Sequence, residues 1–427
     1  MRVWLVTIGE PLHTDPGPPR LLRCGILASR LAEAGHDVCW WTSSFDHTHK
    51  FQRSGPQDQV VSPGLRLRLM QARGYQRNVS LGRLLDHRRL TSTFAAEART
   101  VPPPDLIVAS YPPVELALQA VQYGREHGIP VIVDVRDLWP DIFLDHAPRP
   151  LRPLARALLS GMFAESAEGM RGATAIVGIT DPFVRWALDR AGRAPSPWDR
   201  DFPLSYPQAS HDRESTAQAQ HWWATTHNVT PGPSARITFL GSMTGQVVDL
   251  QAVIAAARQL RDRPVQFVLG GAGEGLAEVV AAARDLPNVV VPGWLDGPRI
   301  NALLAMSWAG IIPYRPRWDF LMSYPNKVIE YLSAGLPVLS GFPGLVGDLI
   351  EQERCGVVYR TGTPGAELSD VVARLEQTPG LPAEMGSNAR RVFLERFSED
   401  AVYGQMVRYL EEVARVMPPT AGVRSQR

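Results

Sequence analysis

A lysine and a glutamate three residues apart form the pattern in this chain best suited to bind a phosphorylated ligand. Only two of the 44 basic residues are lysines, and one of them, Lys327, lies in the stretch Ser-Tyr-Pro-Asn-Lys-Val-Ile-Glu of residues 323–330. In a chain that otherwise uses arginine, a lysine suggests a site that needs a compact point charge, such as one for a diphosphate. The spacing puts Lys327 and Glu330 on one helix face, where Glu330 could accept two ribose hydroxyls. The alternative is a surface ion pair.

The helix that carries this pair has a recognisable start and end. Pro325 favours the first turn, and Ser323 or Asn326 is expected to cap the unpaired amides there. The sequence Ala-Gly-Leu-Pro of residues 334–337 predicts the end of the helix and a turn into a strand.

Glycines that directly follow predicted strands are candidates for close approach to phosphate, because no side chain shields their amides. Residues 239–245, Phe-Leu-Gly-Ser-Met-Thr-Gly, include Gly241, Ser242 and Gly245, with a helix expected at 246–260 behind them. Such turns are also common without a ligand. The glycines of residues 270–273 lack the full spacing of a dinucleotide fingerprint, and we interpret them as a plain turn.

Strands and helices alternate in both halves of the chain. Alternation at this spacing predicts parallel sheets with right-handed crossovers, hence an α/β fold of two Rossmann-like, doubly wound domains. Ligands of such sheets bind beyond the carboxyl ends of the strands. The expected strands are residues 3–8, 38–42, 106–109, 131–135 and 173–178, then 237–240, 265–269, 289–291, 309–314, 338–339 and 356–359.

The predicted domains are separated by a segment with many prolines and little periodicity. We expect an N-terminal domain at 1–190, a linker and surface excursion at 191–235, a C-terminal domain at 236–397 and a final helix and tail at 398–427. In the excursion, Trp222 and Trp223 are expected to anchor it by packing.

Composition limits the class of protein. A net charge of +1 argues against a bulk nucleic-acid binder. Three cysteines without metal-ligand spacing indicate a reducing compartment, and no apolar run is long enough for a signal peptide or a membrane span. We expect a cytoplasmic protein.

One segment departs from this neutral balance. Residues 61–100 hold eight arginines and two carboxylates, interleaved with leucines. Such a surface could dock on anionic lipid, which would make the protein peripheral at the inner face of the plasma membrane. The alternative is a solvated arginine face over an ordinary core.

Three motifs together resemble one known family. The pattern Pro-Asn-Lys-x-x-Glu-Tyr-x-x-Ala-Gly-x-Pro-Val of residues 325–338 resembles the nucleotide-binding signature of family 4 retaining glycosyltransferases, which have the GT-B fold with two domains facing a central cleft. Residues 23–47 and the Asp-Val-Arg-Asp-Leu-Trp-Pro motif of residues 134–140 resemble the N-acetyl-fucosaminyltransferase-like branch of surface-polysaccharide biosynthesis.

The resemblance implies a role for each matching residue. Lys327 would contact the donor diphosphate and Glu330 the ribose, with the 241–245 loop at the phosphates. Gly293 and Trp294 would lie beside the base. Asp137 and Arg136 would reach the donor sugar or acceptor, and Arg23 and His47 the acceptor or leaving phosphate; Asp137 could instead cap the following turn.

Two departures from the family pattern affect the donor site. Many members have a glutamate where this chain has Met322, and many have an arginine and a lysine in the loop that reads Ser-Met-Thr-Gly-Gln at residues 242–246. Charge on the diphosphate would then be met by Lys327 with Arg315 or Arg23. No Asp-x-Asp pair ends a predicted strand, so no metal or other cofactor is expected.

The resemblance therefore implies a retaining, metal-independent transfer of a hexosyl or N-acetylhexosaminyl group. The donor would be a nucleotide diphosphate sugar, with UDP expected, and the acceptor a saccharide or a polyprenyl-diphosphate-linked saccharide. Two alternatives share the fold: a UDP-sugar 2-epimerase, which needs no acceptor, and a catalytically silent scaffold.

Overall fold

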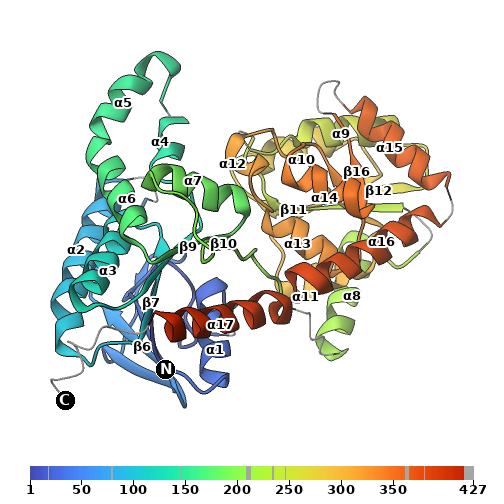
Figure 1. Ribbon diagram of the computed structural model, residues 1–427. Helices are drawn as coiled ribbons and strands as arrows, with labels where there is room; N and C mark the ends of the chain where they lie inside the picture. Colours follow the sequence, from blue (N-terminus) through green and yellow to red (C-terminus); the bar gives the residue numbers. More distant parts are fainter. Residues whose placement is uncertain are drawn as a thin grey trace. The chain divides into compact units, whose positions relative to one another are not determined.

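The computed structural model describes residues 1–17, 19–77, 80–145, 147–207, 213–232, 235–245, 247–360, 365–378 and 380–417 (Figure 1). The chain forms two compact units. Unit 1 comprises Met1–Pro203 and the chain from Val402 onward, and unit 2 comprises Leu204–Ala401. The first division lies inside the segment 191–235, and the second lies within the last described helix.

Unit 1 is built on an eight-stranded sheet with the order β10-β9-β8-β7-β1-β2-β6-β5. All neighbours pair in parallel except β5 and β6, which form an antiparallel pair at one edge. The strands are β1 Arg2–Val6, β2 Asp37–Ser43, β5 Asp58–Ser62, β6 Leu65–Met70, β7 Leu106–Tyr111, β8 Val131–Val135, β9 Ala175–Gly178 and β10 Arg200–Asp201; β3 Phe45–Asp46 and β4 Phe51–Gln52 form a separate pair.

Helices cover both faces of this sheet. The helices of unit 1 are α1 Arg23–Glu33, α2 Leu81–Glu97, α3 Val114–His127, α4 Asp141–Asp145, α5 Arg152–Leu158, α6 Ser160–Gly172, α7 Asp181–Ala191 and, from Val402 on, α17 Glu399–Val416, with 3-10 turns at Ala98–Thr100 and Arg149–Leu151. Helices α3 and α7 end at glycines in the left-handed conformation, Gly128 and Gly192, as helix C-termini favour.

The core of unit 1 follows from strand alternation, because neighbouring side chains point to opposite faces. Val3 and Leu5 of β1 pack with α1 and with α17, which supplies seven buried side chains from Val402 to Val413. Trp4, between them, faces the other side and contacts the rings of Trp41, Phe94 and Tyr123. Figure 1 shows α17 beside α1.

Unit 2 is built on a six-stranded parallel sheet with the order β13-β12-β11-β14-β15-β16. Its strands are β11 Ala235–Ser242, β12 Val265–Ala272, β13 Val289–Gly293, β14 Ala309–Ile312, β15 Val338–Ser340 and β16 Gly356–Val358. Its helices are α8 Arg213–His227, α9 Leu250–Gln259, α10 Leu276–Ala283, α11 Gly297–Ala305, α12 Trp318–Leu321, α13 Asn326–Ser333, α14 Leu345–Glu353, α15 Ala366–Glu376 and α16 Leu381–Val392, followed by a π-helical turn at Phe393–Phe397.

Two apolar layers hold the unit 2 sheet. Leu240, Val268 and Ile312 pack on one face with α11, α13, α14 and α16, while Phe239 and Phe267 pack on the other with α9 and α15. The predicted architecture of parallel α/β sheets in two doubly wound domains is therefore confirmed.

The segment expected to lack periodicity contains a helix, α8, on unit 2. Its sequence is polar enough to hide the pattern, but Trp223 is fully buried and its indole nitrogen donates to the carbonyl of Arg299 at 2.8 Å. Trp222 stacks edge-on against Trp223. Packing of the tryptophans anchors the helix; residues 208–212 and 233–234 of the predicted linker lie outside the described residues.

The basic, leucine-bearing segment of residues 61–100 divides mainly between strand β6 and helix α2. The leucines of β6 at 65, 67 and 69 are buried in the core, because strand alternation turns them inward. The arginines between them are paired with carboxylates, Arg66 with Asp37 and Arg68 with Asp58 and Glu97. The part of this segment that forms β6 is therefore an arginine face over a core. Within residues 61–100, only the start of α2 exposes leucines.

In the described part of the chain, no helix combines the length and the hydropathy that crossing a bilayer would require.

Candidate functional site

A cavity of about 290 Å³ opens in unit 2 beyond the carboxyl ends of β11, β12 and β13. This is the edge at which parallel sheets bind ligands. It brings together four residues that the sequence selected, Gly241, Ser242, Trp294 and Lys327. The wall is completed by Leu240, Gly270, Gly271, Ala272, Leu295 and Ile300.

Two glycines close the floor of this cavity, one from each of two paired strands. Gly241 of β11 is in register with Gly271 of β12. Gly271 has φ +149°, and a Cβ there would lie 1.8 Å from the carbonyl oxygen of Gly241. Glycine is therefore required at 271. Residues 270–272 continue strand β12, so the interpretation of residues 270–273 as a plain turn was wrong, and Gly270 and Gly271 also line the cavity.

Helix α13 brings the lysine and the glutamate to the cavity. It begins at Asn326, directly after Pro325, and no side chain caps it, so the expected capping by Ser323 or Asn326 was wrong. Pro325, fixed at φ −55°, supplies the entry to the helix instead. Asn326 is exposed at the first turn.

The carboxylate of Glu330 is held by two hydrogen bonds. Lys327 Nζ donates to Oε2 at 2.5 Å, and the hydroxyl of Tyr206 donates to Oε1 at 2.5 Å. Glu330 is 1% exposed and the Lys327 side chain 22%. The pair is thus an i,i+3 ion pair, but a largely desolvated one that reaches the cavity wall at Lys327, unlike a surface ion pair.

Two tyrosines next to Glu330 remain neutral. Burial, followed by the charge of Glu330, raises the pKa of Tyr331 well above its ordinary value, and the same two causes raise the pKa of Tyr314. The Tyr331 hydroxyl accepts the amide of Leu240 at 2.9 Å. Through that bond α13 fixes the end of β11, where the loop of Gly241 begins.

An exposed indole flanks the cavity at the end of β13. Gly293 turns the chain with φ +80°, and Trp294 follows it with 69% of its surface exposed. A large aromatic ring left open at a cavity can stack on a planar ring of a ligand. Its neighbour Leu295 is buried and anchors the turn.

The rest of the predicted phosphate loop lies outside the cavity wall. Arg315 donates to the carbonyl of Gly245 at 3.2 Å and pairs with Asp249 at 3.3 Å. The helix expected from 246 begins at Leu250, where Asp249 caps it by accepting the amide of Ala252. The capping carboxylate thus takes the place that an anionic ligand would need at this helix end. Gln246 lies outside the described residues.

In unit 1, the two predicted arginines belong to a buried ion network. Arg23 donates to Asp134 through Nε at 2.9 Å and Nη2 at 3.0 Å, and its Nη1 donates to the carbonyl of Phe202 at 2.8 Å. Arg136 pairs with the same Asp134 and with Glu10. Burial would raise the pKa of Asp134, but the two guanidinium groups outweigh it and hold that pKa below its ordinary value. These contacts hold the guanidinium of Arg23 inside unit 1, and its predicted phosphate role stays a prediction.

Asp137 follows β8 and closes the turn after it. One carboxylate oxygen accepts the amide of Leu138 at 2.8 Å and the other accepts the indole N–H of Trp139 at 3.1 Å. These contacts match the alternative in which Asp137 caps the turn.

His47 lines a cavity of about 170 Å³ beyond the ends of β1 and β2. Its Nδ1 shares a hydrogen bond of 2.5 Å with the hydroxyl of Tyr75. Burial, then the charges of Lys50 and Arg83, lowers the pKa of His47 to about 4. Burial, then Arg83, lowers the pKa of His87 in the same cavity to about 3. Both imidazoles are neutral at physiological pH, and a neutral imidazole can accept a hydrogen bond.

Arg83 also lines a second, apolar groove of about 290 Å³ in unit 1. The groove runs between the start of α2 and α6, and its apolar lining is Leu81, Leu84, Trp139, Phe143, Leu159 and Met162. The guanidinium of Arg83 lies over the ring of Trp139, 5.0 Å from its centroid. One arginine therefore separates a polar cavity from an apolar groove. Of the residues that line the two sites, sequence reasoning had selected only His47 as a candidate site residue, because the lining comes from six separate stretches of the chain.

The fold is shared with solved glycosyltransferases. Sucrose-phosphate synthase from Thermosynechococcus elongatus superposes with a TM-score of 0.69 at 15% identity, over 97% of this chain and 99% of that one. The Anabaena protein Alr3699/HepE, solved in complex with UDP, superposes with a TM-score of 0.62 at 13% identity, over 96% and 99%. Two doubly wound units of this kind define the GT-B fold class.

Sequence comparison places each unit within that class. Residues 23–198 match the family model "Glycosyl transferase 4-like domain", and residues 234–377 match "Glycosyl transferases group 1". Each unit is therefore similar to a family of glycosyltransferase domains. A curated relative, MMP α-(1→4)-mannosyltransferase from Mycolicibacterium hassiacum, is 27% identical over 174 residues, 40% of this chain. That match spans 41% of the relative's length.

Proposed function

We propose that this protein is a retaining, metal-independent glycosyltransferase that uses a nucleotide diphosphate sugar as donor. The observation that carries the proposal is the convergence of Lys327, backed by Glu330, with paired glycines and the open ring of Trp294 around one cavity in unit 2. A cation, amides without side chains and an aromatic platform are what a nucleotide diphosphate requires.

Each part of the donor has a proposed partner. Lys327 binds the diphosphate as a point charge, and the backbone at Gly241 and Gly271 approaches the phosphates. Trp294 stacks on the base. Glu330 accepts the ribose hydroxyls through the oxygen that Tyr206 now occupies. The predicted roles of Asn326, Gly245 and Arg315 have no support from this cavity wall.

UDP is the proposed nucleotide. The solved Anabaena protein of this fold was obtained with UDP and with UDP-glucose, and the curated relative is a mannosyltransferase. These similar proteins support a hexose donor, and an N-acetylhexosamine is the alternative. The N-acetyl-fucosaminyltransferase-like branch stays a prediction.

The acceptor is proposed to bind in unit 1. The polar cavity of His47 and His87 suits a saccharide hydroxyl, and the adjoining apolar groove suits an alkyl or polyprenyl chain. Arg83, which lines both, suits the phosphate between the two parts of a lipid-linked acceptor. A role in surface-polysaccharide synthesis fits such an acceptor.

The proposed reaction breaks the bond between the anomeric carbon and the β-phosphate oxygen, and forms a bond to the acceptor oxygen on the same face. The acceptor proton passes to the leaving diphosphate, whose charge Lys327 stabilises. Neutral His47 is a candidate hydrogen-bond acceptor for that hydroxyl. Arg136 and Asp137 stay predictions for the reacting sugar.

The test is calorimetric titration of the protein with UDP and a panel of UDP-sugars, followed by product analysis. We expect Lys327→Ala and Glu330→Ala each to weaken UDP binding at least tenfold, and Lys327→Arg to impair it as well. Arg258→Ala, which breaks an exposed ion pair with Asp285 elsewhere on unit 2, is the matched control. Unchanged binding in all three variants would reject the donor site.

Turnover separates the proposal from its alternatives. Transfer should persist in EDTA, because no step uses a metal. Conversion of the donor to its 2-epimer without an acceptor would show that the protein is an epimerase and would reject the proposed transfer. Tight UDP-sugar binding with no turnover on any acceptor would favour a non-catalytic scaffold.

A further inference from the structure

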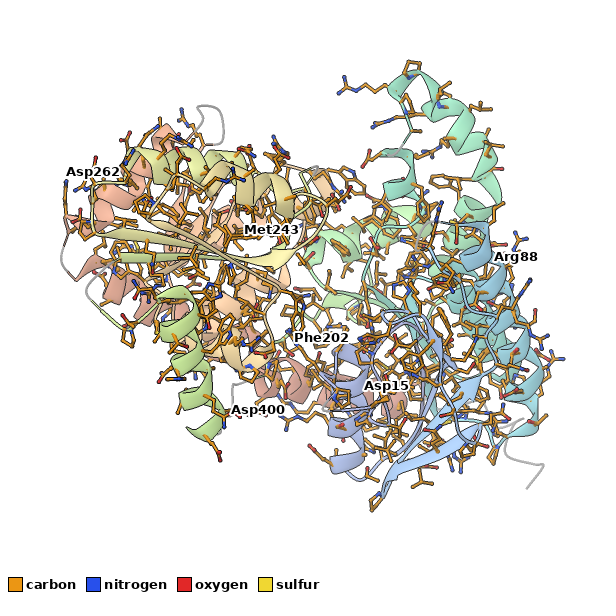
Figure 2. All side chains as sticks on the ribbon, turned by 180° about the vertical axis from the view of Figure 1, so that it is seen from behind. Asp15, Arg88, Phe202, Met243, Asp262 and Asp400 are labelled. Carbon is orange, nitrogen blue, oxygen red and sulfur yellow. The ribbon has the colours of Figure 1, made fainter. Side chains whose placement is uncertain are left out.

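A short helix in unit 1 exposes leucines on every turn. In α5 and the 3-10 turn before it, Leu151, Leu154 and Leu158 are 53%, 60% and 79% exposed, and neither element has a buried residue. Figure 1 shows α4 and α5 projecting from the body of unit 1, and Figure 2 shows the side chains of α5 extending outward around the helix. Clustered exposed leucines mark an interaction surface on a water-soluble fold.

The same stretch is strongly basic. Residues 147–163 contain Arg149, Arg152 and Arg156 and no aspartate or glutamate. Arg152 is paired with Asp145 before the stretch, while Arg156 lies over the ring of Phe163 and Arg149 is exposed. Charge complementarity therefore calls for an anionic partner.

The start of α2 extends this surface. Leu81 and Leu85 are exposed there, as are Arg88 and Arg89 one turn further on; Figure 2 labels Arg88 on this helix. The apolar groove joins the two parts, because Leu81 lines it from α2 and Leu159 from the end of α5. We name the joined area, residues 81–89 with 149–159, the leucine–arginine surface.

A lipid bilayer fits this surface better than another protein. Leucines on a projecting helix can enter the acyl boundary to the shallow depth that interfacial helices reach, while arginines on the same element stay among the phosphates. A second copy of the chain would bring like charges together. Each arginine near an anionic membrane contributes about 1 kcal/mol, so several give measurable binding.

We infer that the leucine–arginine surface docks unit 1 on an anionic phospholipid bilayer. The inference extends the proposed function by naming the membrane as a partner. Only the biological use of docking, the supply of a membrane-bound acceptor, rests on that function. It replaces the sequence-based assignment of residues 61–100, of which only the start of α2 is retained. Docking would place the apolar groove, with Arg83 at its end, where a membrane-bound acceptor is supplied.

The experiment is co-sedimentation of the full chain with vesicles of phosphatidylcholine mixed with anionic phosphatidylglycerol, and with vesicles of pure phosphatidylcholine. We expect binding only to the anionic vesicles, weakening as salt rises. Leu154→Asp with Leu158→Asp should reduce the bound fraction about tenfold or more. Arg149→Gln with Arg156→Gln should also reduce it about tenfold.

The matched control carries Val280→Asp and Leu394→Asp, two exposed apolar residues of unit 2 outside this surface, and should bind as the wild type does. Docking is overturned if the wild type does not sediment with anionic vesicles, or if the leucine and control variants bind equally. It is also overturned if light scattering shows a dimer that the leucine variant abolishes, because a second copy would then occupy the surface.

Failure of docking can be told apart from failure of the proposed function. UDP binding by calorimetry, measured on the same preparations, should be equal in the wild type and the leucine variant, which also shows that the variant is folded. Vesicle binding without any glycosyl transfer would reject the proposed function and leave docking in place.

Discussion

The hydroxyl of Tyr206 donates to Oε1 of Glu330, the buried carboxylate whose other oxygen holds Lys327. Tyr206 lies 124 residues before Glu330, in the segment that joins the two units. The candidate donor site thus contains a hydroxyl group, that of Tyr206, which no sequence motif predicts.

We predict that Tyr206→Phe destabilises the protein by about 1.5–3 kcal/mol, the usual contribution of a hydrogen bond to a charged group. Urea unfolding measures the change. The control is Tyr359→Phe, because the buried hydroxyl of Tyr359 has no partner among the described residues and its removal should be neutral or stabilising. Equal losses in both variants would contradict the importance of the Tyr206 bond.

Gly271→Ala should abolish UDP binding and destabilise unit 2. The added methyl would lie 1.8 Å from the carbonyl of Gly241, at a φ of +149° that other residues rarely adopt. Such overpacking with backbone strain typically costs about 2–5 kcal/mol. Thermal unfolding and calorimetry check both effects. Gly297→Ala, where nothing lies within 4 Å, should leave both unchanged.

Trp294→Ala should weaken UDP binding without loss of stability. Because the indole is largely exposed, little packing is lost, whereas stacking on a base contributes about 1–3 kcal/mol. We expect about a tenfold to hundredfold higher Kd for UDP. Trp222→Ala, on a helix outside the cavity, should leave the Kd unchanged; a drop in both variants would indicate general damage.

Arg23→Met should destabilise unit 1 and leave UDP binding intact. The change leaves Asp134 buried with one of its two guanidinium partners, and breaking such a pair costs about 3–5 kcal/mol. Urea unfolding followed by the fluorescence of the unit 1 tryptophans is the measurement. A stable variant that lost only acceptor turnover would support the predicted phosphate role of Arg23.

Acid should destabilise unit 1 through its buried histidines. The pKa of His87 is lowered from 6.5 to about 3 in the folded state, so between these values the unfolded chain binds a proton that the folded chain does not. The stabilising contribution is therefore full above pH 6.5 and falls as the pH drops, by up to about 3 kcal/mol at pH 4. In His87→Gln the free energy of unfolding should vary less steeply over this range. The exposed His221→Gln is the control.

The sequence predicted the sheets and part of the site, for a physical reason. Buried parallel strands are continuous apolar runs, and Lys327 and Glu330 share one short helix, so local spacing sufficed for both. Local spacing could not predict Tyr206 or the cavity of His47, because those groups meet only through tertiary packing. Local spacing also could not reveal the ion pair of Arg23 with Asp134, since a motif arginine that binds a carboxylate looks the same in sequence as one that binds phosphate.

The burial of α17 against α1 has a consequence for biosynthesis. The side chains from Val402 to Val413 that complete the core of unit 1 leave the ribosome after the whole of unit 2. Synthesis of unit 1 begins before that of unit 2 and ends after it. The apolar surface of unit 1 that α17 covers therefore stays exposed while unit 2 folds. A chain stopped near residue 400 would keep every strand of both sheets and still lack a finished first unit.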